Sequence, residues 1–174
     1  SQSLGSDRLA PGLAFGRFGM SHNRYKALRA RLSFGPEDDA SFRSDPWCFI
    51  KPMVEQFNDH MEEALNPGWL IALDESMSAW LGQLGVGSAD KCPHRSFLPR
   101  KPEPLGTELW AAACALCGML IRLEINEGKA SNPTKEFFAE WKQTTAVSLR
   151  LAKPWFGSKR VVAGDAWFAG VKTA

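Results

Sequence analysis

Two short apolar runs, each ending in an aspartate, determine which sheet this chain can form. Residues 69–74 read Trp-Leu-Ile-Ala-Leu-Asp, and residues 160–165 read Arg-Val-Val-Ala-Gly-Asp. A continuous apolar run between turn residues is typical of a strand that is buried on both faces. The sequence therefore predicts two buried strands, with Asp74 and Asp165 at their carboxyl ends.

Two further apolar runs lie between these strands. Residues 108–114 and 119–125 are separated by a few residues around Gly118, a pattern that predicts a β-hairpin. Residues 81–106 are punctuated by Gly and Pro and are expected to form a long loop.

Four segments have helical patterns. A helix is predicted to begin after Ser21 as N-cap, and a second after Asp45, with Pro46 in its first turn. Residues 133–152 are also predicted to be helical, and Phe168 is expected to open a last helix. The second helix would have one apolar stripe that ends at the Asn-Pro-Gly of residues 66–68, formed by Trp47, Ile50, Val54, Phe57, Met61 and Leu65.

The predicted order is helix, helix, three strands, helix, strand, helix. Three antiparallel strands followed by a helix and one parallel strand make an incomplete ribonuclease H-like mixed sheet of the α/β class. A right-handed crossover would place the last strand beside the first. Asp74 and Asp165 would then meet at the same end of neighbouring parallel strands, where α/β sheets usually bind ligands.

Composition limits the class of protein further. The chain has 174 residues, of which 44% are hydrophobic and 23% charged, the mix of an ordinary soluble domain. Its net charge of +2 does not by itself indicate a nucleic-acid partner. No apolar run approaches the ~18–20 residues that cross a bilayer, so no membrane partner is expected. Four cysteines do not make a disulfide scaffold, which favours a reducing compartment.

Two carboxylates at adjacent strand ends repel each other unless a cation lies between them. Phosphodiester cleavage with two divalent ions uses such an arrangement, and carboxylate oxygens suit Mg²⁺. A strand-end cap or a surface turn is the alternative interpretation of each aspartate alone. Glu75 follows Asp74 directly, so in a strand it would point to the opposite face, and it is not assigned to the metal.

Four stretches of the chain resemble segments of piggyBac-like transposases, in the same order and at suitable distances. Together they span about residues 15–174, and the combination is more specific than any one motif. The stretches are residues 20–25 (Met-Ser-His-Asn-Arg-Tyr), 73–77 (Leu-Asp-Glu-Ser-Met), 98–106 (Leu-Pro-Arg-Lys-Pro-Glu-Pro-Leu-Gly) and 161–168 (Val-Val-Ala-Gly-Asp-Ala-Trp-Phe).

The resemblance implies a site and an activity. Asp74 and Asp165 would be the first two acids of an Asp-Asp-Asp triad that binds Mg²⁺ or Mn²⁺ on a ribonuclease H-like fold. The family cuts DNA at transposon ends and joins them to TTAA targets, which implies DNA partners and a nuclear location. The third acid would lie beyond residue 174, so this chain is expected to be an inactive part of a longer protein. A homodimer is left open.

The resemblance also suggests contacts with DNA. Arg100 and Lys101 lie in the loop before the second strand, and Arg24 lies on the basic first helix. A solvated charged surface is the alternative for all three. Trp80, Trp167 and Phe168 could stack on a base or line the site, and core packing is favoured for Phe168.

Two features leave a second function open. The Gly-Gln of residues 82–83 and Ala166 after Asp165 depart from the residues usual in the family. Both are compatible with a domesticated, non-catalytic module that binds DNA or protein, or with a decayed copy. The expected domains are a flexible lead-in over residues 1–19, a helical segment over 20–66 and the truncated catalytic domain over 67–174.

A Cys-x-x-Cys pair adds one minor alternative. Cys114 and Cys117, with Cys92 and His94 upstream, have ligand types that zinc binds. No second Cys-x-x-Cys occurs, so buried thiols at the hairpin are favoured over structural zinc.

Overall fold

The chain divides into two units, residues 1–37 and residues 38–174. The structure is a computed structural model that describes residues 19–31, 35, 40–79, 94–141 and 143–168. The first unit contains helix α1 (His22–Arg29). Its N-terminus is capped as predicted, because Ser21 Oγ accepts a hydrogen bond of 3.2 Å from the backbone N–H of Arg24.

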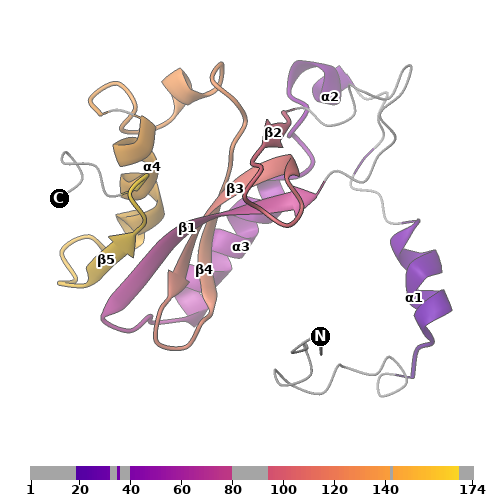
Figure 1. Cartoon of the computed structure of the whole chain (residues 1–174), viewed down its shortest axis with the longest axis horizontal. Coiled ribbons are helices and arrows are strands. Elements are labelled where there is room, and N and C mark those ends of the chain that lie inside the picture. The colour runs from indigo at the N-terminus through magenta and orange to yellow at the C-terminus, as the bar shows by residue number, and fades with distance from the viewer. Residues whose placement is uncertain (1–18, 32–34, 36–39, 80–93, 142, 169–174) are drawn as a thin grey trace, which may run out of the picture. The chain divides into compact units, whose positions relative to one another are not determined.

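The second unit is built on a five-stranded mixed sheet (Figure 1). Strand β3 pairs antiparallel with β1 on one side, and with β2 and β4 on the other. Strand β5 pairs parallel with β1, so the predicted α/β sheet of antiparallel strands with one parallel addition is confirmed. The strands are β1 (Leu70–Ala79), β2 (Ser96–Phe97), β3 (Leu105–Cys114), β4 (Leu120–Ile125) and β5 (Val161–Gly164).

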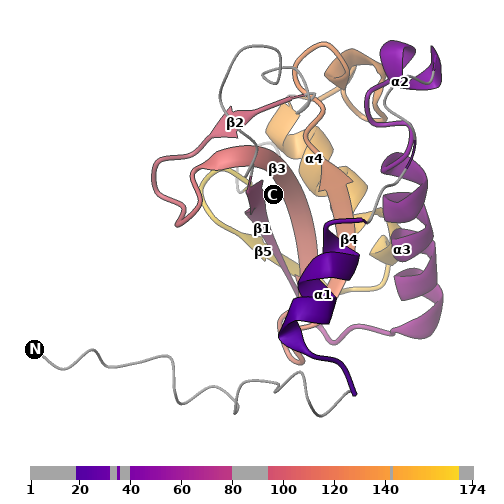
Figure 2. The same ribbon diagram turned by 90° about the vertical axis from the view of Figure 1, so that its right-hand side faces the viewer.

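Two helices pack on one face of this sheet (Figure 2). Helix α3 (Lys51–Ala64) precedes β1, and α4 (Gln143–Ala152) forms the crossover to β5. The remaining helical elements are α2 (Ala40–Ser44) and the short 3₁₀ turns η3 (Asn132–Thr134) and η4 (Lys153–Trp155). The buried core consists of Ile71, Leu73, Trp110, Ala112, Cys114, Ile121, Val147, Leu151 and Phe168, with Met61 of α3 and Leu65, which follows α3, packed against it.

Helix α3 begins later than predicted. Asp45 does not cap α3, because residues 46–50 form turns before the helix; its carboxylate accepts the backbone N–H of Trp47 at 3.0 Å and pairs with Lys51 Nζ at 2.8 Å. Pro52 explains the difference, because proline has no N–H and its ring clashes with the carbonyl four residues earlier. Proline is tolerated only in the first turn of a helix, which fixes the start at Lys51. The predicted end at residues 66–68 is confirmed.

Strand β1 is longer than the apolar run that predicts it. It continues through Asp74 and Glu75 to Ala79, and it pairs with β3 from Ile71 to Ala79. Asp74 therefore lies in the middle of β1, whereas Asp165 follows the end of β5.

The segment before α4 is the other clear difference. Residues 126–141 form turns and the short η3 element, and only Gln143–Ala152 of the predicted 133–152 helix is α-helical. Phe137 has a φ of 65°, which an α-helix cannot accommodate. The predictions of the hairpin, of the last strand and of a helix end before Lys153 are confirmed. Strand β2 lies within the expected loop.

The outer edge of β4 is closed by a side chain of α3. Asn58 Nδ2 donates to the carbonyl of Leu123 at 2.9 Å, and the Leu123 N–H donates to Asn58 Oδ1 at 2.8 Å. One amide thus replaces the two hydrogen bonds that a neighbouring strand would make with this residue.

Residues 38–174 form one unit by their contacts, and the expected domain boundaries after residues 19 and 66 stay predictions. Helix α3 packs on β4 and contributes to the core, so residues 38–66 share a unit with the sheet. The expectations for the lead-in before residue 19, Trp80, the 82–83 pair, Cys92 and the helix after Phe168 lie outside the described residues. Within the described residues, no helix combines the length and apolar character needed to span a membrane.

We expect Asn58→Ala to lower the free energy of unfolding by about 1–2 kcal/mol, because both backbone groups of Leu123 lose their partner. The control is Asp59→Ala, an exposed neighbour in α3 that shares the gain in helix propensity. Urea denaturation of both variants measures the difference. Equal stabilities would show that the amide contributes nothing to the edge of β4.

Candidate active site

The two aspartates lie on neighbouring parallel strands in matching positions. Strands β1 and β5 pair in the register Leu70↔Val161 to Leu73↔Gly164, and the next residue on each chain segment is an aspartate. Asp74 is exposed, and its Oδ1 accepts the N–H of Glu75 at 2.8 Å. The structure thus brings together two residues that are far apart in the sequence.

The turn after β5 fixes the orientation of Asp165. Its Oδ1 accepts the backbone N–H of Trp167 at 2.9 Å and, more weakly, that of Phe168 at 3.4 Å. Gly164 allows this turn, because a Cβ there would lie 2.6 Å from the Cβ of Phe168. The Asp165 backbone is therefore held close to the core, while the second carboxylate oxygen takes no part in the turn.

Glu75 lies on the face of β1 opposite Asp74, as predicted, and its side chain is only 6% exposed. Lys101 Nζ donates to the backbone carbonyl of Glu75 at 2.7 Å and lies 3.2 Å from its Oε1. The Arg100 guanidinium pairs with the same carboxylate. Two cations therefore neutralise this buried charge, which would otherwise be costly to remove from water.

Arg100 also reaches the second aspartate. Its Nη1 lies 3.9 Å from Asp165 Oδ2, while Nη2 pairs with Glu75. The guanidinium remains 61% exposed, so it places a positive charge at the surface beside Asp165. Of the predicted DNA contacts, Arg100 therefore lies at the site, whereas Lys101 is largely used in holding Glu75.

Arg24 lies in the other unit, on α1, where every residue is exposed. Its contact with DNA stays a prediction.

The aromatic residues after Asp165 pack against the sheet. Trp167 stacks on Trp110 with ring centroids 5.8 Å apart and an interplanar angle of 24°. Its ring also meets Phe168 edge-on at 4.7 Å. Phe168 is buried in the core, which confirms its favoured role, and Trp167 is partly exposed at the surface.

The donor chemistry at this site fits a hard divalent ion. Asp74 and Asp165 supply carboxylate oxygens, the ligands that Mg²⁺ prefers. Among the described residues, no group of three or more His, Cys, Asp or Glu side chains is placed to hold a metal. The two aspartates could therefore supply only part of the ligands of such an ion.

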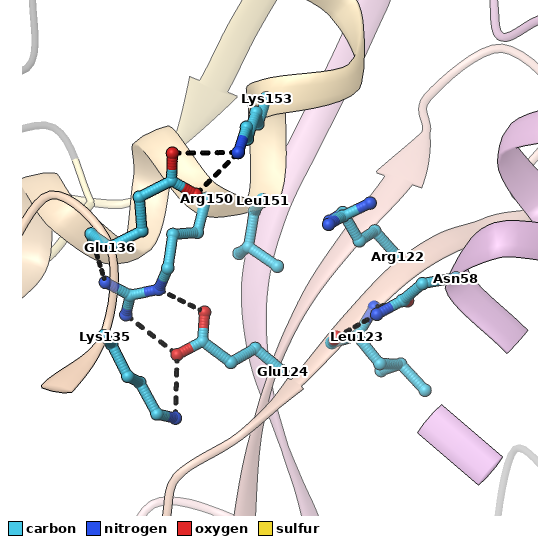
Figure 3. A pocket seen from close by; sticks show the side chains of 9 residues that line it. All are labelled: Asn58, Arg122, Leu123, Glu124, Lys135, Glu136, Arg150, Leu151 and Lys153. Atoms are coloured by element: carbon cyan, nitrogen blue, oxygen red, sulfur yellow. Dashed lines mark hydrogen bonds and ion pairs between the residues drawn. The ribbon is translucent and has the colours of Figure 1, made fainter. Parts of the chain in front are cut away.

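A cavity of about 270 Å³ lies where α3, β4 and α4 meet, apart from the aspartates (Figure 3). Arg150 forms a bidentate pair with Glu124, at 2.9 and 2.8 Å, and Lys135 pairs with the same carboxylate at 3.1 Å. Lys153 pairs with Glu136 at 2.6 Å. The two pairs to Glu124 join α4 and the segment before it to β4, and the Lys153–Glu136 pair joins η4 to that segment. The ion pairs that line this cavity therefore have a structural role.

Sequence analysis missed the partners of Glu75 and of Glu124. A signal for Glu75 was present, since it follows Ile71 and Leu73 at alternate positions and so falls on the buried face. The consecutive cations Arg100 and Lys101 were the available partners.

The sheet and its crossover define an α/β fold with a mixed sheet. The sequence model of the Transposase IS4 family matches residues 13–174, and the chain belongs to that family. The resemblance to piggyBac-like transposases is thereby supported.

One similar solved structure is the cryo-EM structure of a piggyBac transposase synaptic complex with hairpin DNA. The TM-score is 0.69 at 20% sequence identity, and the match covers 92% of this chain. It covers 33% of that chain, so the present chain spans about a third of its length. The comparison with curated proteins finds no relative of this chain.

We expect Glu75→Gln to lower the free energy of unfolding by about 2 kcal/mol, because Arg100 and Lys101 lose their anionic partner. The effect should fall below that of a fully buried pair, since Arg100 can turn to water. Glu103→Gln, an exposed change in the same loop, is the control and should be neutral in urea denaturation. A Glu75→Gln variant as stable as the control would contradict the assignment.

Two of the ion pairs in Figure 3, Arg150–Glu124 and Lys153–Glu136, should differ in strength. Arg150 is 13% exposed, and Arg150→Met should destabilise the protein by about 3 kcal/mol because it leaves Glu124 without its bidentate partner. Lys153 is 50% exposed, and Lys153→Met should cost less than about 1 kcal/mol. Thermal or urea unfolding of the two variants measures both losses of stability. A larger loss for Lys153→Met than for Arg150→Met would contradict the structural role of the Arg150–Glu124 pair.

Proposed function

We propose that the chain is part of the catalytic domain of a piggyBac-like DNA transposase of the Asp-Asp-Asp type. The main support is the position of Asp74 and Asp165, each following the last paired residues of neighbouring parallel strands. Family membership makes DNA breakage and joining the chemistry to expect at two such carboxylates. Such chemistry is consistent with a nuclear location.

In this proposal Asp74 and Asp165 hold Mg²⁺ or Mn²⁺. The ions supply activation of the attacking oxygen and stabilisation of the leaving oxygen of a phosphodiester. The turn N–H groups on Asp165 Oδ1 keep that side chain in one orientation, so an ion would bind at Oδ2, beside Arg100 Nη1 at 3.9 Å. A third acid, outside this sequence, would complete the ligand set, and the chain alone would not catalyse.

DNA is the proposed partner. Arg100 places an exposed guanidinium beside Asp165, where it can contact a phosphate next to the bond that is cut. Helix α1 adds exposed Arg24, Lys26 and Arg29 without an acidic residue in its first turn. Non-specific contacts of this kind would make DNA binding salt-dependent.

A non-catalytic module derived from a transposase is the second candidate. The observation in its favour is the pairing of Asp165 with Arg100, which offsets a charge that a metal would otherwise neutralise. Such a module would keep the fold and the basic surface but would not bind a divalent ion at the aspartates.

Titration of the chain with Mn²⁺, followed by electron paramagnetic resonance of the free ion, tests the proposal. Asp74→Asn and Asp165→Asn should each weaken Mn²⁺ binding by about tenfold or more, since each removes a carboxylate ligand. Asp59→Asn, an exposed change on α3, should leave binding unchanged. Binding that is indifferent to both site variants would reject the metal site and favour the non-catalytic module.

A further inference from the structure

Two thiols lie at the turn between β3 and β4, outside the site described above. Cys114 is the last residue of β3, and Cys117 follows three residues later, before β4 begins. We propose that Cys114 and Cys117 form a redox-active dithiol that closes to a disulfide by exchange with a low-molecular-weight disulfide such as oxidised glutathione. This proposal is independent of the transposase function.

The turn geometry brings the two cysteines within reach of each other. The Gly118 N–H donates to the Cys114 carbonyl at 2.8 Å, and the Cys114 N–H donates to the Met119 carbonyl at 2.9 Å. Gly118 adopts a φ of 71°, which reverses the chain at small steric cost. Residues three apart across a tight turn lie within about 7 Å, close to the Cα separations that a disulfide bridges.

The surroundings of Cys114 favour its thiolate. The Gly68 N–H donates to Cys114 Sγ at 3.4 Å. This contact, with hydrogen bonds from the backbone and side chain of Cys117 and from the Leu116 N–H, lowers the pKa of the Cys114 thiol to about 7. A thiolate near neutral pH is the form that attacks a disulfide.

Exposure assigns a different role to each sulfur. Cys114 is only 2% exposed, whereas Cys117 is exposed to solvent. A small disulfide can therefore reach Cys117 first, and the buried Cys114 thiolate is placed to attack next. Cys117 is the entry thiol and Cys114 is the resolving thiol.

The exchange balances in two steps. The Cys117 thiolate attacks one sulfur of oxidised glutathione, which forms a mixed disulfide and releases one glutathione thiolate. The Cys114 thiolate then attacks Cys117 Sγ and displaces the second glutathione thiolate. Two protein thiols are oxidised to one disulfide, and one glutathione disulfide is reduced to two thiols that take up the protons.

The test uses the whole chain with Cys48→Ser and Cys92→Ser, so that only the pair remains. The protein is equilibrated with oxidised glutathione at pH 7.5 and at pH 6, then quenched with acid and analysed by intact mass and peptide mapping. The expected product is the Cys114–Cys117 disulfide without bound glutathione. Formation of this disulfide should be slower at pH 6 than at pH 7.5, because the thiolate is the attacking form.

Single variants separate the two roles. Adding Cys114→Ser should trap glutathione on Cys117, because no resolving thiol remains. Adding Cys117→Ser should leave the buried Cys114 reduced over the same time. Circular dichroism checks that each variant is folded. A stable glutathione adduct on the parent chain, or equally rapid modification of the Cys117→Ser variant in its folded state, would overturn the proposal.

Discussion

A buried negative charge in the middle of the central strand is the constraint that organises this sheet. Glu75 lies on the core face of β1, and the strand can continue past it only because Arg100 and Lys101 bring positive charge from the loop before β3. The same contact fastens that loop beside the aspartates. The ion pairs that stabilise the buried Glu75 thus also hold the Arg100 cation beside Asp165.

Most of the fold follows from local pattern. The two apolar runs that end in aspartate, and the hairpin around Gly118, predict β1, β3, β4 and β5 because strand formation here follows hydrophobicity. The prediction fails where a tertiary contact or a single proline outweighs the pattern. Pro52 moves the start of α3 to Lys51, and Phe137, with its positive φ, interrupts the expected long helix.

The candidate site was predictable in part. A right-handed crossover is enough to place Asp74 beside Asp165, because strand order then follows from chain order. The role of Arg100 was not predictable in detail, since its contacts with Glu75 and Asp165 join three segments distant in sequence. Spacing alone also cannot show that Lys101 is used internally, because a basic loop residue has the same appearance whether or not it is paired.

The side-chain amide of Asn58 makes the edge of the sheet at β4 differ from β5 in its free backbone hydrogen-bonding groups. On β4 it occupies the backbone groups of Leu123, which a docking strand would need. On the far side, β5 pairs with β1 in the described part of the chain, and its four residues are exposed. A strand that docks on β4 would therefore have to displace the Asn58 amide, whereas the exposed residues of β5 lie next to the strand that carries Asp74.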